Sequence, residues 1–292
     1  MIEVRFSSSD EIARLKQIWK RCFGDSDRYI DFFYNNRYKP EETIILLDDG
    51  EIATMLVTFP MRIMGPDGRS FSTMYLYAFG TDPKFRGRGF GTQIISFADR
   101  HLSLQGLDTA ITVPADDGMF EYFGREGYTE SFFMREARIW RKEIRPNAFG
   151  GEITKALPVD YNVVRNGCLA GTLHVQYDDE AMEYQKKLSV EAGADIYIIN
   201  VNGVTGCATL EINEDGAVFV KELLLPDEYL QAGLALISDI LPVDYYNVRT
   251  PAFAGENLGG KVRHYGMIKW YRSLMQVERA YRGQGYMAFA YD

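Results

Sequence analysis

One stretch is the most informative part of this sequence: residues 82–92 read Asp-Pro-Lys-Phe-Arg-Gly-Arg-Gly-Phe-Gly-Thr. It follows an apolar run typical of a strand, residues 74–80, and precedes residues 90–102, where apolar side chains recur every four positions as on one helix face. Glycines let backbone N–H groups approach an anion, and a helix N-terminus adds partial positive charge. A glycine-rich, arginine-bearing turn between a strand and a helix therefore predicts a phosphate site.

The glycine spacing excludes two common nucleotide motifs, which disfavours a nucleotide-binding domain of another fold. The dinucleotide fingerprint Gly-x-Gly-x-x-Gly fails because its last position falls on Thr92 or on Ile94, depending on the starting glycine. The P-loop fails because no Gly-Lys-Ser or Gly-Lys-Thr follows these glycines. The pattern that fits is Arg-x-x-Gly-x-Gly, over residues 86–91.

This pattern resembles the acyl-CoA pyrophosphate loop of the GNAT superfamily of N-acetyltransferases. Pro83 stands three residues before Arg86, as in that family's Val-x-Pro-x-x-Arg run, with Thr81 in the Val position. Downstream, residues 109–113 have the pattern of a strand, and residues 120–128 resemble the family's Tyr-x-x-x-Gly-Phe segment. The similarity covers about the first half of the chain. It implies a mixed α/β fold, a strongly twisted mixed sheet flanked by helices.

The resemblance also implies acetyl-CoA as the cosubstrate, held mainly by backbone groups. The pantetheine arm would pair with the strand before the loop, as an added strand does. A backbone N–H of that strand would polarise the thioester carbonyl as charge develops on its oxygen. The pyrophosphate would rest on the loop, with two arginines beside it. The cofactor-binding residues implied are Phe79, Gly80, Thr81, Arg86, Gly87, Arg88, Gly89, Phe90, Gly91 and Thr92.

The sequence departs from the family at the proton donor for the leaving thiolate. Many members use a tyrosine four residues before the glycine of the Gly-aromatic pair, and counting back from Gly127 leads to Phe123. The neighbouring phenol is Tyr122, but one residue along a helix turns a side chain by about 100°. Either the short helix is shifted and Tyr122 is the catalytic acid, or another donor or water serves, or activity is weak. Tyr75 and Tyr77, on the strand before the loop, are second candidates.

The general base is not identified by a motif. Asp116, Asp117 and Glu121 are the carboxylates nearest in sequence to the expected acceptor cleft and could bind an ammonium or relay its proton. The two aspartates could instead cap the helix that follows. The related acetyltransferases of the enhanced-intracellular-survival type use a C-terminal carboxylate, which in this chain belongs to Asp292.

The second half of the chain repeats the order of the first without its loop. Residues 198–207 echo residues 46–53 as the start of a hairpin, and a later strand leads into residues 226–229, Pro-Asp-Glu-Tyr. Two carboxylates and no glycine would repel a pyrophosphate and keep the backbone away. We therefore predict a GNAT acyl-CoA-binding catalytic domain over residues 1–145. Residues 146–292 are predicted to be a degenerate GNAT-like domain without a phosphate loop.

Residues 282–285 read Arg-Gly-Gln-Gly and resemble the loop a second time. Too few residues follow to form the supporting helix, so the prediction for this stretch is a tail.

Composition limits the remaining function classes. The chain has 292 residues, 46% of them hydrophobic, which predicts a folded core rather than disorder. Its net charge of −9 argues against a nucleic-acid partner. The three cysteines and three histidines lack the spacing of a disulfide framework or a metal site. No signal peptide or membrane-length apolar run is evident, so we expect a cytoplasmic protein without membrane contact.

The leading hypothesis is an acetyl-CoA-dependent N-acetyltransferase that acts on a primary amine of a small molecule or, as a variant, on a protein amine. The alternative is a regulatory pseudo-acetyltransferase that binds CoA or acyl-CoA without catalysis. The phosphate loop counts equally for both because binding is not turnover. The identity of the acceptor, the acyl chain length and the oligomeric state are not encoded in a short motif.

Overall fold

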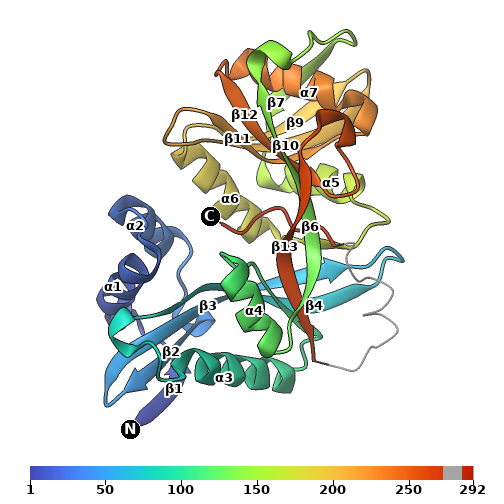
Figure 1. The fold of residues 1–292 in the computed structure, drawn as a ribbon. Helices are drawn as coiled ribbons and strands as arrows, with labels where there is room; N and C mark the ends of the chain where they lie inside the picture. The colour runs from blue at the N-terminus through green and yellow to red at the C-terminus, as the bar shows by residue number, and fades with distance from the viewer. Residues whose placement is uncertain (272–284, 292) are drawn as a thin grey trace. The chain divides into compact units, whose positions relative to one another are not determined.

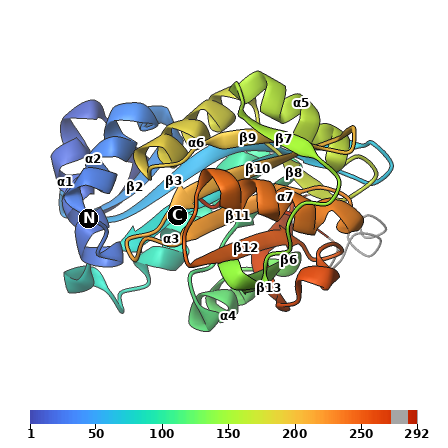
Figure 2. The same cartoon turned by 90° about the horizontal axis from the view of Figure 1, so that it is seen from above.

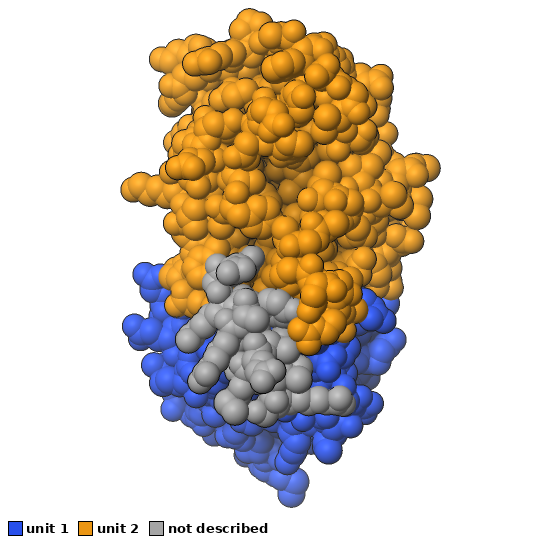
Figure 3. Space-filling model, turned by 90° about the vertical axis from the view of Figure 1, so that its right-hand side faces the viewer, with its two compact units in different colours: residues 1–62, 71–129, 267–276 blue, residues 63–70, 130–266, 277–292 orange. Residues whose placement is uncertain are grey.

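The computed structural model describes residues 1–271 and 285–291. The chain forms two compact units, coloured separately in Figure 3. Unit 1 comprises Met1–Arg62, Phe71–Thr129 and Met267–Gln276, and unit 2 comprises Ile63–Ser70, Glu130–Gly266 and Val277–Asp292. These units describe packing; the division into a catalytic domain to residue 145 and a degenerate domain after it stays a prediction.

Unit 1 is built on a mixed sheet in the order β1-β2-β3-β4-β5-β13, in which the β4–β5 pair is parallel (Figure 1). The strands predicted at residues 74–80 and 109–113 and the helix predicted at residues 90–102 are present, as β4, β5 and α3. The elements are β1 Ile2–Phe6, α1 Ile12–Phe23, α2 Asp27–Asn36, β2 Thr43–Asp48, β3 Glu51–Met64, β4 Ser70–Thr81, α3 Phe90–Leu104, β5 Thr109–Thr112 and α4 Asp117–Arg125.

Local chemistry explains where the first two helices stop and start. Gly24 ends α1 in the left-handed conformation, with φ of 77°, which glycine adopts without a steric penalty. The Ser26 hydroxyl then accepts a hydrogen bond from the Tyr29 N–H at 3.1 Å and caps α2. Gly24 and Ser26 together set the boundary between these two helices.

The helices of unit 1 cover opposite faces of its sheet. The predicted apolar stripe of α3 is buried, with Ile94 fully enclosed in a core that also includes Phe123 of α4. On the other face, α1 buries Leu15, Ile18 and Trp19. Helices therefore cover both faces of the sheet at β4, the strand that leads into the glycine-rich loop.

The strands of unit 2 are hydrogen-bonded in the order β13-β6-β12-β11-β10-β9-β7, with β11 and β12 parallel. Helix α7 packs on one face with its apolar side chains, and α5 and α6 contact β10 from the other (Figure 2). The elements are β6 Thr129–Trp140, β7 Gly151–Lys155, α5 Pro158–Cys168, β8 His174–Gln176, α6 Asp179–Glu191, β9 Ile196–Val201, β10 Val204–Ile212, β11 Val218–Leu224, α7 Asp227–Ile240, β12 Tyr245–Pro251 and β13 Lys261–Trp270.

The order of elements in the first half recurs in the second. A strand, two helices, three strands, a helix and a strand run from β1 to β5 and again from β7 to β12, with β8 as an addition. No element is predicted from sequence for residues 146–195, where β7, α5, β8 and α6 lie. The short β7 and the weakly periodic α6 carry little pattern of their own, and tertiary packing stabilises them.

Each unit takes its remaining strand from the other half of the chain. β6, which follows α4, pairs antiparallel with β12 in unit 2. β13, which follows the elements of the second half, pairs antiparallel with β5 in unit 1 through Met267–Trp270. The Nζ of Lys269 on this strand donates to the Asp99 carboxylate of α3 at 2.6 Å, which ties β13 to the core of unit 1. Neither half of the sequence therefore supplies a complete sheet.

Candidate functional site

A backbone irregularity in β4 marks the centre of the candidate site. Ala78 has φ of +46°, a left-handed conformation that costs a residue with a side chain about 1–2 kcal/mol. Before it, Tyr77 faces the first two helices, with its ring 5.7 Å from that of Trp19. After it, Phe79 faces the opposite side, where its ring stacks on Tyr122 of α4 at 5.7 Å. The irregularity interrupts the usual alternation of a strand and redirects the residues that lead into the loop.

The strand β4 continues beyond the end of its parallel partner. Its register with β5 ends at Leu76 and Thr112, whereas β4 itself runs to Thr81. Strands that separate in this way leave backbone N–H and C=O groups without a ladder partner on that side. Such an edge can accept an extended ligand as an added strand.

The backbone direction of the final β4 residues follows from one hydrogen bond. The Asp82 N–H donates to the Ala53 carbonyl of β3 at 2.9 Å. Because backbone groups alternate sides along a strand, those of Phe79 and Thr81 point away from β3, toward the side that β5 has left. Both belong to the cofactor-binding residues that the family resemblance implies, and Gly80 lies between them.

The loop after β4 has the open backbone that the sequence predicts. Gly87 and Gly89 have φ of +77° and +75°, and a Cβ built on either would meet no atom within 4 Å. Gly89 is the N-cap of α3, and no side chain caps this helix. The first N–H groups of α3, from Phe90 onward, therefore border open space in the arrangement that favours an anion.

Gly91 is required for a different reason. A Cβ at this position would lie 3.0 Å from the Phe79 ring and 3.0 Å from the Tyr122 hydroxyl. The first turn of α3 is thus packed closely against both the β4 edge and α4, and a side chain here would push the three apart.

The two arginines of the loop have different surroundings. Arg86 is exposed, and its Nε donates to the Thr81 carbonyl at 3.2 Å, at the junction of β4 and the loop. Arg88 forms an ion pair with Asp48 at 2.7 Å and lies 4.8 Å from the centre of the Phe90 ring. Lys84 pairs with Glu51. Arg86 is therefore the cation best placed for a phosphate on the loop, whereas Arg88 already has a carboxylate partner.

A carboxylate not anticipated from sequence also reaches the loop. The Thr92 hydroxyl, in the first turn of α3, donates to Glu126 at 2.9 Å. A negative charge near a helix N-terminus is favourable by itself, but it opposes the approach of a second anion. Glu126 follows α4 directly, and its position at Thr92 depends on how α4 packs on α3.

The side chains of Phe123 and Tyr122, the two positions considered for the proton donor, point in different directions. Phe123 is 2% exposed and belongs to the core, with its ring 5.3 Å from that of Tyr128. Tyr122 faces Phe79 and Gly91, and its hydroxyl oxygen is buried without a hydrogen bond among the described residues. Burial raises the pKa of Tyr122, with the nearby Thr92 hydroxyl opposing part of this shift. Of the two neighbours, Tyr122 is the one beside the β4 edge and the loop.

The other expected acid–base residues lie in ordinary surroundings. The Asp116 carboxylate caps α4 by accepting the Met119 N–H at 2.9 Å. Asp117 and Glu121 are exposed on the first turns of the same helix. The hydroxyls of Tyr77 and Tyr29 are 2.9 Å apart. Tyr75 is buried, and Asp292 and residues 282–284 lie outside the described residues.

The N-terminus of α7 in unit 2, which corresponds to that of α3, carries carboxylates in place of glycines, as its sequence indicates. α7 begins at Asp227 and carries Glu228 in its first turn. The Asp227 carboxylate accepts the Gly255 N–H at 2.9 Å. Leu225, at the end of the preceding strand, packs so closely that a Cβ on Gly233 would lie 2.5 Å from it. This helix terminus is thus occupied by the protein's own carboxylates and apolar side chains.

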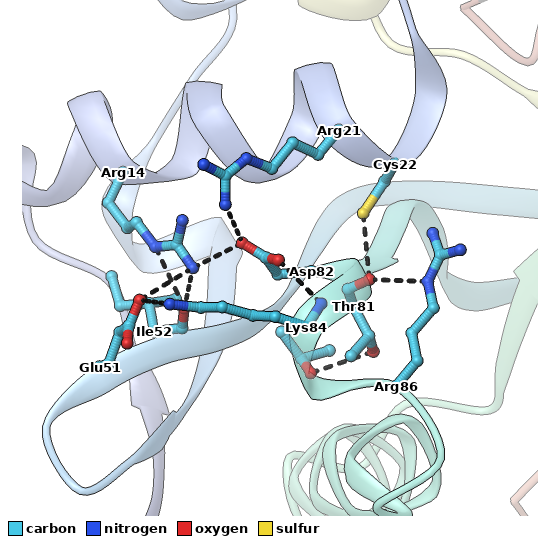
Figure 4. A network of polar contacts seen from close by, with 10 residues as sticks. Arg14, Arg21, Cys22, Glu51, Ile52, Thr81, Asp82, Lys84 and Arg86 are labelled. Atoms are coloured by element: carbon cyan, nitrogen blue, oxygen red, sulfur yellow. Dashed lines mark hydrogen bonds and ion pairs between the residues drawn. The ribbon is translucent and has the colours of Figure 1, made fainter.

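Two residues of the site were not recognisable from sequence. Ala78 has no side chain that signals a left-handed backbone. Asp82 is 1% exposed and accepts hydrogen bonds from Arg14 and Arg21 of α1 (Figure 4). Its position before Pro83 suggests a turn, but only the fold brings the two arginines to it.

Residues 1–271 and 285–291 contain neither a membrane-spanning helix nor a metal-binding cluster. No helix there has the length and apolar character needed to cross a membrane. No cluster of three or more His, Cys, Asp or Glu side chains in that part of the chain could hold a metal ion.

Solved structures similar to this chain share its fold at low sequence identity. A GCN5-related N-acetyltransferase from Anabaena variabilis is 15% identical, with a TM-score of 0.71 over 93% of this chain and 73% of that one. A probable N-acyltransferase from Enterococcus faecalis is 14% identical, with a TM-score of 0.73 over 95% and 74%. Eis1 from Mycobacterium abscessus is 14% identical, with a TM-score of 0.68 over 97% and 76%. The expected GNAT fold is thereby confirmed.

No curated protein sequence matches the chain significantly. The family model described as "Acetyltransferase (GNAT) domain" matches residues 3–130. That match contains β4, the glycine loop, α3 and α4, the elements that build the candidate site. The GNAT family expected from the loop is thus confirmed for residues 3–130, and the chain carries an acetyltransferase domain of this family there.

Proposed function

We propose that this chain is an acetyl-CoA-dependent N-acetyltransferase that transfers an acetyl group to a primary amine of a small molecule. The observation that carries the proposal is the continuity of two binding surfaces. The β4 edge left open beyond Leu76 leads within a few residues into an uncapped helix N-terminus at Gly89. A CoA thioester has the matching parts, an extended pantetheine arm and a pyrophosphate.

The residues present fit this cosubstrate. Phe79 offers its backbone groups and Thr81 its N–H to the pantetheine amides, since the Thr81 carbonyl already accepts from Cys22 and Arg86. No protein atom lies within 4 Å of a Cβ built on Gly87 or Gly89. The pyrophosphate can therefore approach the N–H groups of α3. The Arg86 guanidinium adds a formal charge beside them. These contacts would hold the thioester next to the irregularity at Ala78.

The reaction requires a neutral amine, a polarised carbonyl and a proton donor. The amine nitrogen attacks the thioester carbonyl carbon, and a backbone N–H of the β4 edge stabilises the negative charge that develops on oxygen. The C–S bond then breaks and the thiolate departs with its electron pair. We propose that Tyr122 supplies a proton to that sulfur, because its buried phenol faces the β4 edge and its raised pKa keeps it protonated. The proton of the amine passes to water or to an acceptor-side carboxylate.

A second candidate function is a CoA-binding regulatory protein without catalysis. Phe123, at the position where many members have the acid, lies in the core and is no proton donor. Glu126 beside Thr92 weakens the anion site as well. Turnover separates this candidate from the first, since both require the same cosubstrate site.

The test begins with calorimetric titration of acetyl-CoA into the unaltered chain and into an Arg86→Ala/Gly89→Glu variant. We expect a single site per chain that the variant loses. CoA release with a panel of small amines then separates the enzyme from the regulator. If acetyl-CoA does not bind the unaltered chain, both candidates are wrong; if it binds and no amine gives CoA release above background, the regulatory candidate replaces the first.

The remaining properties follow as part of the proposal. An amine acceptor suits a chain of net charge −9, and neither nucleic acid nor a membrane is proposed as a partner. We propose a cytoplasmic location, where acetyl-CoA is available. A protein amine stays the variant acceptor.

A further inference from the structure

The junction between β4 and the loop is held by a buried carboxylate. Asp82 is the first residue after β4 and is 1% exposed. Its Oδ1 accepts the Lys84 N–H at 3.2 Å, which caps the 3-10 turn that opens the loop. Its Oδ2 accepts from Arg14 at 2.7 Å and from Arg21 at 2.9 Å, so one carboxylate binds two guanidinium groups of α1 (Figure 4).

Helix α1 contacts the same junction at a second point. The Cys22 thiol donates to the Thr81 carbonyl at 3.3 Å, the carbonyl that also accepts from Arg86. A Cβ on Gly80 would lie 3.0 Å from the Cys22 sulfur, so β4 and α1 are in direct contact there. The last β4 residues are therefore clamped from one side by α1.

The clamp is also tied to the sheet. Arg14 donates from Nε and Nη2 to the Ile52 carbonyl of β3, at 3.2 and 2.9 Å. Burial alone would raise the pKa of Asp82, but the hydrogen bonds from Arg14 and the Lys84 N–H outweigh it, and the pKa lies below its usual value. Asp82 is thus held ionised between α1, β3 and the loop.

Asp82 lies in the chain between the two parts of the proposed ligand site, the β4 edge and the glycine loop. Phe79 and Thr81 precede Asp82, and Gly87 and Gly89 follow it. A ligand that spans both parts gains affinity from both only when they are held at a fixed spacing. A ligand that uses only the loop does not depend on that spacing.

We propose that Asp82 is a positioning residue of the acyl-donor site, which holds the β4 edge and the phosphate loop in register through Arg14 and Arg21 of α1. The inference rests on the proposed function. It extends it by assigning a role in donor binding to α1, whose residues lie far from the loop in sequence. Asp82 itself touches neither the thioester nor the acceptor in this scheme.

The test compares a spanning ligand with a partial one. Asp82→Asn keeps an oxygen for the Lys84 N–H and removes the charge that binds both arginines. We expect its Kd for CoA to rise at least tenfold. The Kd for adenosine 3′-phosphate 5′-diphosphate, which has the pyrophosphate and no pantetheine, should change less than twofold. Arg21→Met should act in the same direction, and the double variant should bind CoA no more weakly than Asp82→Asn alone.

Two controls keep the outcome specific. Asp31→Asn removes a different ion pair of α1, with Lys16 at 2.7 Å, and should leave both Kd values unchanged. Arg21 is half exposed, so Arg21→Met tests the proposal if Asp82→Asn does not fold. CoA affinity within twofold of the unaltered chain in both variants, or equal losses for CoA and the partial ligand, would overturn the inference alone. Failure of the unaltered chain to bind CoA would overturn the proposed function and this inference with it.

Discussion

Replacing Gly89 by alanine isolates the role of the loop backbone. Gly89 caps α3 in the left-handed region, with φ of +75°, and open space surrounds the position of a new Cβ. The substitution therefore causes no clash within the protein. It changes the chain in two ways: it introduces backbone strain, and it places a methyl group where we propose the pyrophosphate approaches.

The two effects have different sizes and different readouts. An L-residue in this conformation costs about 1–2 kcal/mol of folding free energy. Gly68, in the turn between β3 and β4, has φ of +79° and likewise no atom within 4 Å of a new Cβ. Gly68→Ala should therefore lower stability by a similar amount. Loss of close approach to the α3 N–H groups should weaken CoA binding at least tenfold, or about 1.4 kcal/mol, in Gly89→Ala only.

Thermal unfolding and calorimetric titration with CoA, carried out on both variants, measure the two effects. We expect matched decreases in the melting temperature and a loss of affinity confined to Gly89→Ala. If Gly89→Ala binds CoA as tightly as the unaltered chain, the anion does not rest on this loop. If Gly68→Ala loses affinity equally, the effect reflects general destabilisation, and the argument from the loop fails.

Three further outcomes follow from the structure. Tyr122→Phe should lower kcat by about 10²-fold or more with little change in the Kd for acetyl-CoA, since general acid catalysis is worth roughly that much; an unchanged kcat would assign the proton to water or another donor. Burial, with the charge of Arg165 adding to it, lowers the pKa of His174 to about 4. The unfolded histidine is protonated below about pH 6.5 and the folded one only near 4. Stability should therefore fall as the pH is lowered through this window, by about 2 kcal/mol between pH 7 and pH 5, and denaturant titrations of His174→Gln should show a smaller dependence. A fragment of residues 1–145 should show no cooperative unfolding transition, because β5 would lack its partner strand β13. A sharp transition in calorimetry would show that unit 1 folds without β13.

Much of unit 1 could be predicted because its signals are local. The four-residue spacing of Phe90, Ile94, Ala98 and Leu102 indicates a helix with one buried face, and all four side chains are buried in the structure. The glycines at 87 and 89 predict a backbone that side chains disfavour, and both have positive φ. Such features depend on residues within a few positions of one another.

The acid and the anion partners could not be predicted in the same way. Family spacing points to Phe123, yet the packing of α4 turns this ring into the core and presents Tyr122 to the site. Arg88 looks equivalent to Arg86 in the sequence, but Asp48 of β2 engages its guanidinium. Both outcomes are set by side chains that meet only after β2, α3 and α4 have packed.

Residues 74–102 were thus enough to predict a strand, an anion-binding loop and a helix, because backbone freedom and hydrophobic period depend on neighbouring residues. The tertiary structure decided that Ala78 reverses the face of β4, that Asp82 binds two arginines of α1, and that β6 and β13 complete sheets far from their places in the sequence. Each of these depends on contacts between segments separated by tens to hundreds of residues. Their energies come from burial and pairing that only the folded chain provides.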